Sequence, residues 1–415
     1  MKWTFRLSDL YLIKKESLAM TLLCWGMFIA FLGSLNPWFL WPIGKHYIIP
    51  ASLLVVGAML IAHSMKEDNI FTRNDFLIPI LALLVFIVYE RLSISANING
   101  YIVQIFRLTV FYALFRLNND RLRRVMDFIC RLMGLLLIVS LAGHVAYLIG
   151  IPLPGRNVEF DEWYSYINHY LFLLDDRNLF TIFPRFNSYF LEPSHIGQAC
   201  AFLLMSQWGK WRRWYNLTLL ATVFLTFSLA AYVYLTAIVF FNQWAAMKHM
   251  FRNVIIVVVL LAAAVTTVFT YNGGDNLVHD LIMLRLEIED DGTLAGDNRV
   301  TGQFQADYDN YIESSDILFG RKFEAVEFGN AGYHVFFYDH GIVGILLIFL
   351  FYYLSMMYTP NKRALVSVLI LTLLYFWATA FMLWENIFFP LYAAAYLATP
   401  GKKPESPAPL SPVKT

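Results

Sequence analysis

The sequence predicts an all-α polytopic integral membrane protein, and three of its features lead to this prediction. Of the 415 residues, 59% are hydrophobic and only 15% are charged, whereas about one quarter of the residues of a globular protein are charged. Apolar runs of about 20 residues, long enough to cross roughly 30 Å of hydrocarbon, follow one another along the chain. Basic residues gather in alternate short connections, as in multi-pass proteins. These features exclude a soluble enzyme and a protein with a single membrane anchor.

We expect about twelve transmembrane helices. The predicted spans cover residues 17–34, 46–64, 75–91, 98–117, 124–150, 190–207, 214–228, 230–247, 253–271, 334–357, 363–381 and 384–399. The stretch from Leu217 to Met247 is too long for one span and short for two. Ser228 and its small neighbours therefore predict a tight turn between two compact helices.

The distribution of basic residues predicts how the helices are oriented. Several short connections on the same side as the N-terminus carry Arg121, Arg123, Arg124, Lys210, Arg212, Arg213, Lys248, Arg252, Lys362 and Arg363. The short connections on the opposite side carry only Lys45 and Arg91. By the positive-inside rule the first side is cytoplasmic, so both termini are predicted to lie inside the cell.

The predicted spans and connections divide the chain into six parts. They are an N-terminal five-helix membrane part (1–150), a first long periplasmic loop (151–189), central membrane helices (190–271), a large periplasmic loop (272–333), C-terminal membrane helices (334–399) and a disordered cytoplasmic tail (400–415). Function concentrates in long loops. We expect both extracytoplasmic loops to contain short helices, as the helix-like spacing of apolar residues between Val300 and Glu313 indicates.

Charge, cysteine content and motifs exclude several classes of protein. The net charge is only +1, so no global basic field predicts binding to nucleic acid. Cys24, Cys130 and Cys200 fall inside apolar segments and lie too far apart to suggest a metal cluster. A glycine-rich phosphate loop, a serine nucleophile elbow and an HExxH motif are all missing, which argues against an ATP-driven pump. The apolar run from Met20 to Gly33 lacks a small-residue cleavage site and predicts an uncleaved signal-anchor.

The first candidate site is the segment from Phe183 to His195, at the end of the first long loop. Proline is favoured at the first position of a helix and keeps the preceding residue extended, so Pro193 predicts where the sixth span begins. Arg185, Glu192 and His195 then lie at the outer mouth of the bundle. The free N–H groups of the helix start favour an anion there. In the alternative interpretation, Glu192 pairs with Arg185 and only fixes the loop.

The second candidate site lies in the acidic large loop, where residues 296–302 are followed by the segment 316–321. Arg299 is a fixed positive charge among carboxylates, and its planar guanidinium matches phosphate oxygens in a way that lysine does not. In the alternative interpretation, Arg299 only neutralises its acidic neighbours. Asp307 and Asp309 are a weak match to a metal-binding carboxylate pair, and we assign no metal to them.

The third candidate site lies at the start of the tenth span. His334 is at the helix entrance, and Tyr338 lies one turn deeper on the same face. Gly341 and Gly344 offer a small-residue surface for close helix packing. Histidine titrates near neutrality and can take a proton from a sugar hydroxyl. In the alternative interpretation, His334 is a structural histidine at the membrane interface.

Five ionisable residues lie well inside predicted spans: Arg107, Arg131, His144, Asp339 and Glu385. A charge in hydrocarbon is costly unless it is paired or hydrated, so such residues usually face a cavity or the bundle interior. Arg107 is the deepest of the five. It is either a second cationic contact for a lipid phosphate or the buried partner of an intramembrane carboxylate, and the sequence supports both interpretations equally.

Together, the three candidate segments resemble the O-antigen polymerase/ligase superfamily, bacterial membrane glycosyltransferases that act outside the cytoplasmic membrane. RFNSYFLEPSHIG (185–197) resembles the family's segment with an arginine followed by Glu-Pro. GDNRVTGQF (296–304) with DILFGR (316–321) resembles its arginine-bearing large loop. HVFFYDHGIVG (334–344) resembles its helix start from histidine to glycine. The resemblance covers residues 150–357, while the first five spans match only as generic hydrophobic helices.

One departure from the family concerns the histidine. When Gly341 and Gly344 are aligned with the family's glycines, the usual position of the histidine falls near Asn330. His334 then lies about one helical turn further along the chain than the family's histidine. The identity of the general base therefore stays open between His334 and Glu192.

The resemblance implies a GT-C-like helical bundle, most similar to O-antigen polymerases of the Wzy type. Such an enzyme joins oligosaccharide repeat units carried on undecaprenyl pyrophosphate and releases the lipid pyrophosphate. Arginines outside the membrane can stabilise the growing charge of this leaving group without a metal or cofactor. The resemblance implies a multi-pass protein of a bacterial inner membrane, with its active site on the periplasmic side.

The resemblance also implies roles for particular residues. Arg299, with Arg185 and Arg321, would hold the pyrophosphate, and His334 or Glu192 would activate the acceptor hydroxyl. Arg107, His195 and Tyr189 are further candidate contacts to the substrate, and Trp163, Tyr164 and Tyr189 are candidates for stacking on sugar rings.

Three other functions stay open. An O-antigen ligase of the same superfamily would transfer finished polymer to the lipid A core with much the same arginines. A polysaccharide flippase or other transporter also has about twelve spans, but it would spread ionisable residues along a central cavity. A structural membrane scaffold is the third alternative. The expected partners of a polymerase are the lipid bilayer, a chain-length regulator and a flippase, and no nucleic acid.

Overall fold

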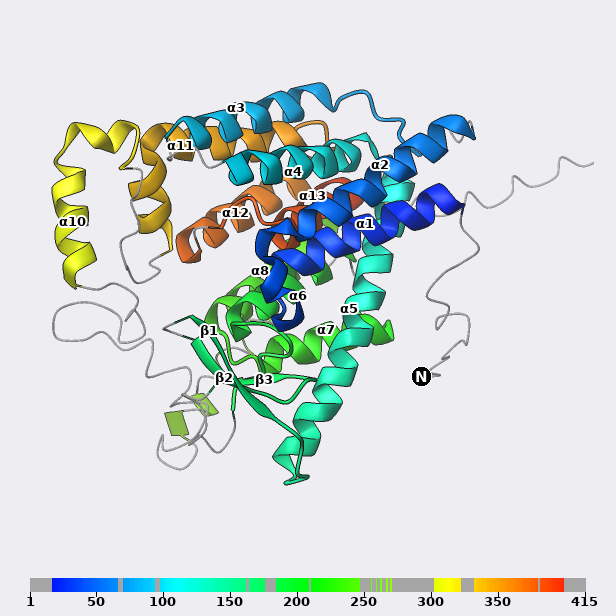
Figure 1. Ribbon diagram of the computed structural model, residues 1–415, viewed down its shortest axis with the longest axis vertical. Coiled ribbons are helices and arrows are strands. Elements are labelled where there is room, and N and C mark those ends of the chain that lie inside the picture. Colours follow the sequence, from blue (N-terminus) through cyan, green and yellow to red (C-terminus); the bar gives the residue numbers. More distant parts are fainter. Residues whose placement is uncertain are drawn as a thin grey trace, which may run out of the picture.

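The computed structural model describes residues 17–65, 70–93, 98–161, 164–175, 184–208, 210–246, 302–321, 332–379 and 381–398, together with single positions between 255 and 270. This part of the chain is mostly helical (Figure 1). Several predictions fall outside it, namely those for Trp163, Arg299, Asn330, the N-terminal residues 1–16 and the tail 400–415. They stay predictions.

The N-terminal part consists of five long helices. They are α1 (Leu18–Ser34), α2 (Ile48–Ser64), α3 (Leu77–Ser93), α4 (Ile98–Arg116) and α5 (Asn119–Leu148), and the 3-10 helix η2 (Trp38–Tyr47) precedes α2. Polar side chains determine where two of these helices begin. The Ser17 hydroxyl accepts a hydrogen bond from the Met20 N–H, and the Asn118 side chain accepts one from the Arg121 N–H. Because Asn118 caps α5, this helix begins earlier than the predicted span.

The second half of the chain contributes shorter helices and one long broken helix. They are α6 (Pro193–Ser206), α7 (Trp214–Leu225), α8 (Leu229–Ala246), α10 (Gly302–Ile312), the 3-10 helix η7 (Ser315–Leu318), α11 (Tyr333–Met356), α12 (Lys362–Ala378) and α13 (Glu385–Leu397). The predicted tight turn at Ser228 is confirmed. Phe227 has a φ of 45°, and the Ser228 hydroxyl accepts from the Ala231 N–H at the start of α8.

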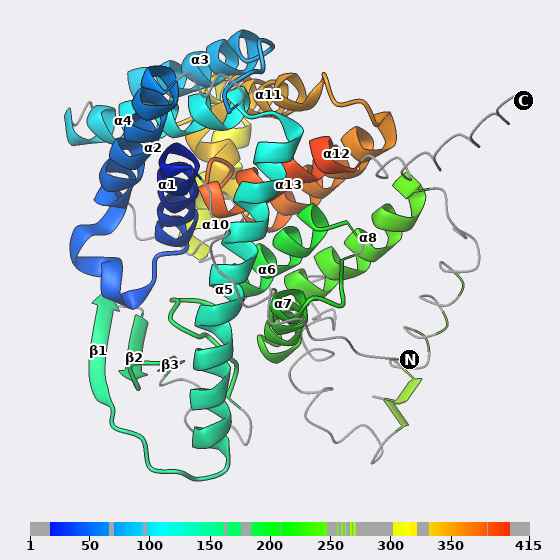
Figure 2. The same ribbon diagram turned by 90° about the vertical axis from the view of Figure 1, so that its right-hand side faces the viewer.

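Three segments of the described chain are long and apolar enough to cross a membrane: Trp38–Ser64, Asn119–Leu148 and Tyr333–Met356. They agree with a helical membrane protein. The helix α6, in contrast, has 14 residues, a length of about 21 Å at ~1.5 Å per residue. All 13 residues of α13 are buried, and this helix lies among the others (Figure 1 and Figure 2).

Short, fully buried helices explain why twelve spans do not follow from the structure. A buried core helix and a membrane span share the same apolar composition, and length separates them better than hydropathy does. The number of twelve spans therefore stays a prediction, although a helix is present at eleven of the twelve predicted positions in the described residues.

A small antiparallel sheet corrects the prediction that the first long loop contains short helices. Its strands are β1 (Arg156–Asp161), β2 (Tyr164–Asn168) and β3 (Leu173–Asp175), in the order β1-β2-β3. Val158 pairs with Tyr166 across the first two strands. Tyr166 and Asn168 of β2 are buried and point to the same side, whereas Ser165 and Ile167 are only partly buried, so one face of the sheet packs on a core. The sheet lies beside the C-terminal half of α5 (Figure 2).

The predicted helix in the large loop is confirmed for its described residues, because α10 covers Gly302–Ile312. It lies beside the start of α11 (Figure 1). The helix α11 is broken at Gly341, which has a φ of 64° and a ψ of −172°. Gly341 therefore marks a break in a helix and is not part of a helix-packing surface, whereas a methyl group on Gly344 would contact Tyr89 of α3 at 3.1 Å.

Candidate functional site

The start of α6 lies where Pro193 predicts it. Pro193 occupies the first turn, and Glu192 is the N-cap residue with an extended backbone (φ −123°, ψ 137°). The Glu192 carboxylate accepts hydrogen bonds from the Tyr164 hydroxyl and from the Ser194 hydroxyl, the second at 2.7 Å. Its Oε2 lies 3.7 Å from Nε2 of His195. A partly exposed carboxylate and an imidazole thus share the mouth of α6.

His195 connects this carboxylate to the start of α13. Its ring packs edge-on against Trp384, with 5.3 Å between the ring centroids, and also against Phe381. Tyr189 lies on the same loop segment, and its carbonyl accepts from the Trp38 N–H at 2.9 Å. Burial raises the pKa of Tyr189, so this phenol stays neutral near pH 7.

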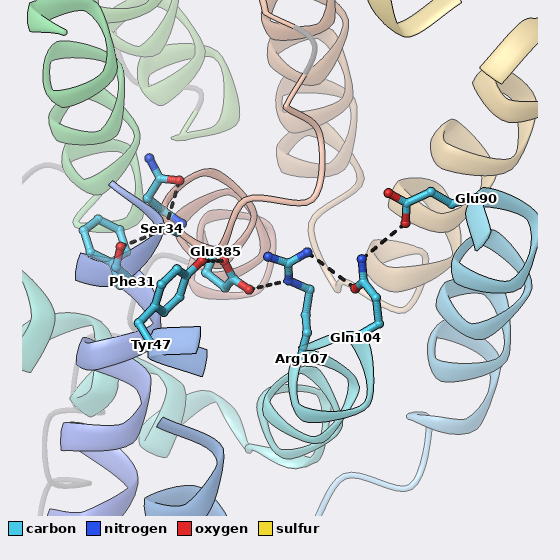
Figure 3. Close-up of polar contacts among 8 residues, drawn as sticks. Phe31, Ser34, Tyr47, Glu90, Gln104, Arg107 and Glu385 are labelled. Carbon is cyan, nitrogen blue, oxygen red and sulfur yellow. Dashed lines mark hydrogen bonds and ion pairs between the residues drawn. The ribbon is translucent and has the colours of Figure 1, made fainter. Parts of the chain in front are cut away.

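A buried ion pair lies directly beyond Trp384, at the start of α13. Arg107 Nε donates to Glu385 Oε1 at 2.6 Å, and the Tyr47 hydroxyl donates to Glu385 Oε2 at 3.0 Å (Figure 3). Glu385 is fully buried, so these contacts satisfy a charge that water does not reach. Arg107 was interpreted either as a contact for a lipid phosphate or as the buried partner of an intramembrane carboxylate. The structure has the contact that the second interpretation requires, the ion pair with Glu385.

The polar network continues from Arg107 towards α3. Gln104 lies one turn before Arg107, and its amide donates to Glu90 Oε2 at 3.3 Å (Figure 3). Lys45 lies within electrostatic range of Arg107, Glu90 and Arg91. The two basic residues of the predicted outer connections, Lys45 and Arg91, therefore converge on the same polar network.

The network contains both cations and carboxylates. Asp339 of α11 lies within electrostatic range of Glu90, which adds a third carboxylate to Glu90 and Glu385. Lys45, Arg91 and Arg107 supply the three positive charges. The Arg107 guanidinium is held by Glu385 inside the protein, so it faces a carboxylate within the bundle.

A second cluster, formed by α10 and the first turns of α11, holds His334. The ring of His334 packs edge-on against Tyr308, with 4.7 Å between the centroids. Tyr338, one turn further on, packs against Tyr311 at 4.9 Å and Phe304 at 5.7 Å. The prediction that His334 and Tyr338 share one helix face is confirmed. Burial raises the pKa of Tyr308 to about 12, so its hydroxyl is a proton donor but not a base.

Arg321 joins this second cluster through side chain and backbone. Its Nε donates to Asp316 Oδ2 at 3.0 Å, and its backbone N–H donates to the Tyr338 carbonyl at 2.7 Å. The guanidinium lies over the rings of Tyr311 and Tyr338. The hydrogen bond that Arg321 donates to the Asp316 carboxylate raises the pKa of Arg321, so the guanidinium is a permanent cation beside the helix start.

The break at Gly341 connects the two clusters. Tyr89 donates its hydroxyl to the His340 carbonyl at 2.6 Å and to the Phe319 carbonyl at 3.0 Å. A break in a helix leaves carbonyl groups without hydrogen-bond donors from the same helix, and the Tyr89 hydroxyl is a donor to the carbonyl of His340. The next residue of α3, Glu90, belongs to the network of Arg107.

Arg185 precedes α6 in the sequence and contacts the turn between α7 and α8, apart from both clusters. Its Nε donates to the Thr226 carbonyl at 3.0 Å, and the neighbouring Phe186 N–H donates to the Leu225 carbonyl. The carbonyl accepts from the guanidinium and so positions it at this turn. The structure thus brings Glu192 and His195 together at the mouth of α6, and brings His334 and Arg321 into the second cluster.

Several residues of these clusters were not identified from the sequence. Gln104 was recognisable, because it lies three residues before Arg107 and so on the same helix face. Tyr47, Tyr89 and Trp384 gave no such signal, since aromatic residues at the ends of spans are common in membrane proteins. Their partners come from distant parts of the chain.

The chain was also compared with known proteins. No protein-family model, no curated protein and no solved structure matches it.

Proposed function

We propose that this chain is a membrane glycosyltransferase of the O-antigen polymerase kind. It would join undecaprenyl-pyrophosphate-linked oligosaccharide repeat units into O-antigen or a related surface polysaccharide. The reaction would take place at the periplasmic face of the bacterial inner membrane, without a metal. The segments that resemble the O-antigen polymerase/ligase superfamily support this proposal.

The observation that supports the proposal best is the pair of Glu192 and His195 at the mouth of α6. The carboxylate is held by Tyr164 and Ser194, and its Oε2 lies 3.7 Å from the imidazole. The side chain of Glu192 is 27% exposed, so a sugar hydroxyl can approach it. A positioned base within hydrogen-bond reach of a hydroxyl is what glycosyl transfer to an acceptor sugar needs.

Between the two candidate bases, the geometry favours Glu192. His334 packs against the rings of Tyr308 and Tyr333, with centroid distances of 4.7 and 3.9 Å. Two aromatic neighbours limit the approach of a substrate to this imidazole. Glu192, in contrast, has polar neighbours on both oxygens and a second titratable group, His195, to receive its proton.

The proposed reaction has one bond-making and one bond-breaking event at the same carbon. The acceptor hydroxyl gives its proton to Glu192, and its oxygen forms a bond to the anomeric carbon of the donor sugar. The bond from that carbon to the pyrophosphate oxygen breaks, and the electron pair leaves with the pyrophosphate. Arginine side chains would stabilise this charge. Arg185 on the loop of Glu192, Arg321 and Arg299 are the proposed cations, whereas Arg107 is buried against Glu385.

Glu192→Gln is expected to abolish long polysaccharide chains. Loss of a general base lowers such rates by about 10²–10⁴-fold, while the amide keeps the size and most hydrogen bonds of the carboxylate. The measurement is a gel of surface polysaccharide from a strain that lacks the native gene and expresses the variant. Glu313→Gln is the matched control, because Glu313 is an exposed carboxylate of the large loop. A normal ladder from the Glu192→Gln protein at wild-type abundance would contradict this role.

The same gel separates a polymerase from a ligase. In the strain that lacks the gene, loss of a polymerase leaves lipid A core with a single repeat unit, whereas loss of a ligase leaves core without any. We expect the single repeat unit. Core without any repeat unit would favour the ligase instead.

A further inference from the structure

A pocket lies between η2 and the strands β1 and β2, apart from the clusters described above. Its volume is about 320 Å³, and it is lined by Trp38, Trp41, Pro42, Arg156, Asn157, Val158, Glu159 and Asn168. This volume is at the lower end of the range for small-molecule sites, and it suits a single sugar ring. We call it the η2–sheet groove.

Two residues that line the η2–sheet groove carry a buried hydrogen-bond donor that has no partner among the described residues. These donors are the indole N–H of Trp38 and the side-chain amide of Asn168. Asn168 is fully buried, and its oxygen is already used, because it accepts from the Tyr170 N–H at 2.7 Å. An unsatisfied buried donor costs free energy, so native proteins usually keep one where a ligand or water completes it.

Aromatic and charged side chains complete the lining of this groove. The Trp41 ring is fixed by a hydrogen bond from its indole N–H to the Asn36 carbonyl at 3.1 Å and by edge contact with Phe160. Arg156 and Glu159 of β1 add one cation and one anion to the lining, and the Arg156 guanidinium lies over the Trp38 ring, 5.9 Å from its centroid. The face of an aromatic ring is electron-rich and attracts the C–H groups of a sugar ring. Hydroxyl groups can accept from the free donors and donate to the carboxylate.

We propose that the η2–sheet groove binds a sugar ring of the oligosaccharide part of the substrate, away from the reacting end. The inference rests on the proposed function, since it supplies the source of the oligosaccharide. A lipid chain does not fit a lining with four polar or charged side chains, and Glu159 disfavours a simple anion. A neutral, hydroxyl-rich ligand matches the rings, the donors and the mixed charges together.

The sheet connects this groove to the candidate base. The strand β2 runs from Tyr164, whose hydroxyl contacts Glu192, to Asn168, which lines the groove. Four steps along a strand span about 13 Å, which corresponds to a few sugar rings. The η2 side of the groove is also connected to the segment that carries Glu192. Pro37 forms a β-bridge with Phe190, and the Trp38 N–H donates to the Tyr189 carbonyl. An oligosaccharide could therefore reach from the groove to Glu192.

Trp38→Phe is the sharpest test of the groove. The substitution keeps an aromatic ring but removes the indole N–H, which has no partner in the free protein within the described residues. It is therefore expected to leave the thermal midpoint unchanged or slightly raised, while binding weakens about tenfold, the effect of one lost hydrogen bond. A residue with a merely structural role would change stability and binding together.

The experiment uses the full-length protein in detergent and saturation-transfer NMR. The probe is a set of oligosaccharides released by mild acid from the surface polysaccharide of the source organism. Trp41→Ala, which removes the aromatic ring, is expected to weaken binding more than Trp38→Phe does. Trp377→Phe is the matched control, because Trp377 is 72% exposed on α12, outside the groove.

The outcomes separate the groove from the proposed function. Equal binding by wild type and Trp38→Phe, or no binding by the wild type at millimolar concentration, would overturn the groove even if the protein joins lipid-linked repeats. Binding that depends on Trp38, in a protein that joins no repeats, would uphold the groove and contradict the proposed function.

Discussion

Arg107→Met is expected to lower the free energy of unfolding by about 3–5 kcal/mol, because it leaves the Glu385 carboxylate buried without its cation. Glu385 is fully buried, and its remaining described contact is the hydroxyl of Tyr47. Replacing the guanidinium by a thioether of similar length keeps most of the packing, so the loss reports on the charge. Thermal unfolding of the protein in detergent, followed by circular dichroism, measures the change.

The double variant Arg107→Met/Glu385→Met is the control for this prediction. It removes both charges together, and exchange of a buried ion pair for apolar side chains is often neutral or stabilising. We therefore expect the double variant to regain most of the stability that the single variant loses. A single variant that unfolds at the same temperature as the wild type would show that the ion pair is hydrated or absent.

Gly341→Ala is expected to displace the segment that carries Arg321 and to abolish long polysaccharide chains. Gly341 has a φ of 64° and a ψ of −172°, a region that is open essentially to glycine alone and costs other residues about 1–3 kcal/mol. An added methyl group would also lie 2.5 Å from the Leu318 carbonyl oxygen and 2.5 Å from the Gly320 nitrogen. Both atoms belong to the backbone, so the segment of residues 315–321 has to move.

Gly57→Ala in α2 is the matched control for Gly341→Ala. An added methyl group there meets only Leu22 Cδ1, at 3.8 Å, which is an ordinary contact. Alanine is favoured over glycine in a helix by about 1 kcal/mol, so this variant should be as stable as the wild type or more so. A Gly341→Ala protein with normal stability and a complete polysaccharide ladder would show that the break in α11 is dispensable.

Local sequence signals were sufficient for the positions of the helices. Pro193 identified the start of α6, and Ser228 identified the turn before α8, because both depend on residues that are adjacent in sequence. The shared face of His334 and Tyr338 followed from helical spacing alone. Such features need no knowledge of the tertiary fold.

The sheet and the short core helices were harder to predict. The strands β1 and β2 have only six and five residues, and apolar and polar residues alternate over just part of them, too little to outweigh an expectation of helix in a helical protein. The burial of α6 and α13 depends on the helices around them, which hydropathy along one chain does not show.

The partners of the candidate residues were the least predictable part. Arg107 on α4 and Glu385 on α13 were both recognised as intramembrane charges, but only tertiary packing brings their atoms within 2.6 Å. The same holds for Tyr164 and Glu192, since the first belongs to a strand that the sequence did not suggest. Sequence reasoning therefore named many of the residues but not their pairing.

We propose that this chain by itself joins lipid-linked oligosaccharides. The most direct test gives the purified protein, in detergent and with a metal chelator, undecaprenyl-pyrophosphate-linked repeat units, and separates the products by size. We expect products of two and more repeat units, released lipid pyrophosphate and no product with Glu192→Gln. Single repeat units left unjoined by the wild-type protein, or joined equally well by Glu192→Gln, would contradict the proposed function.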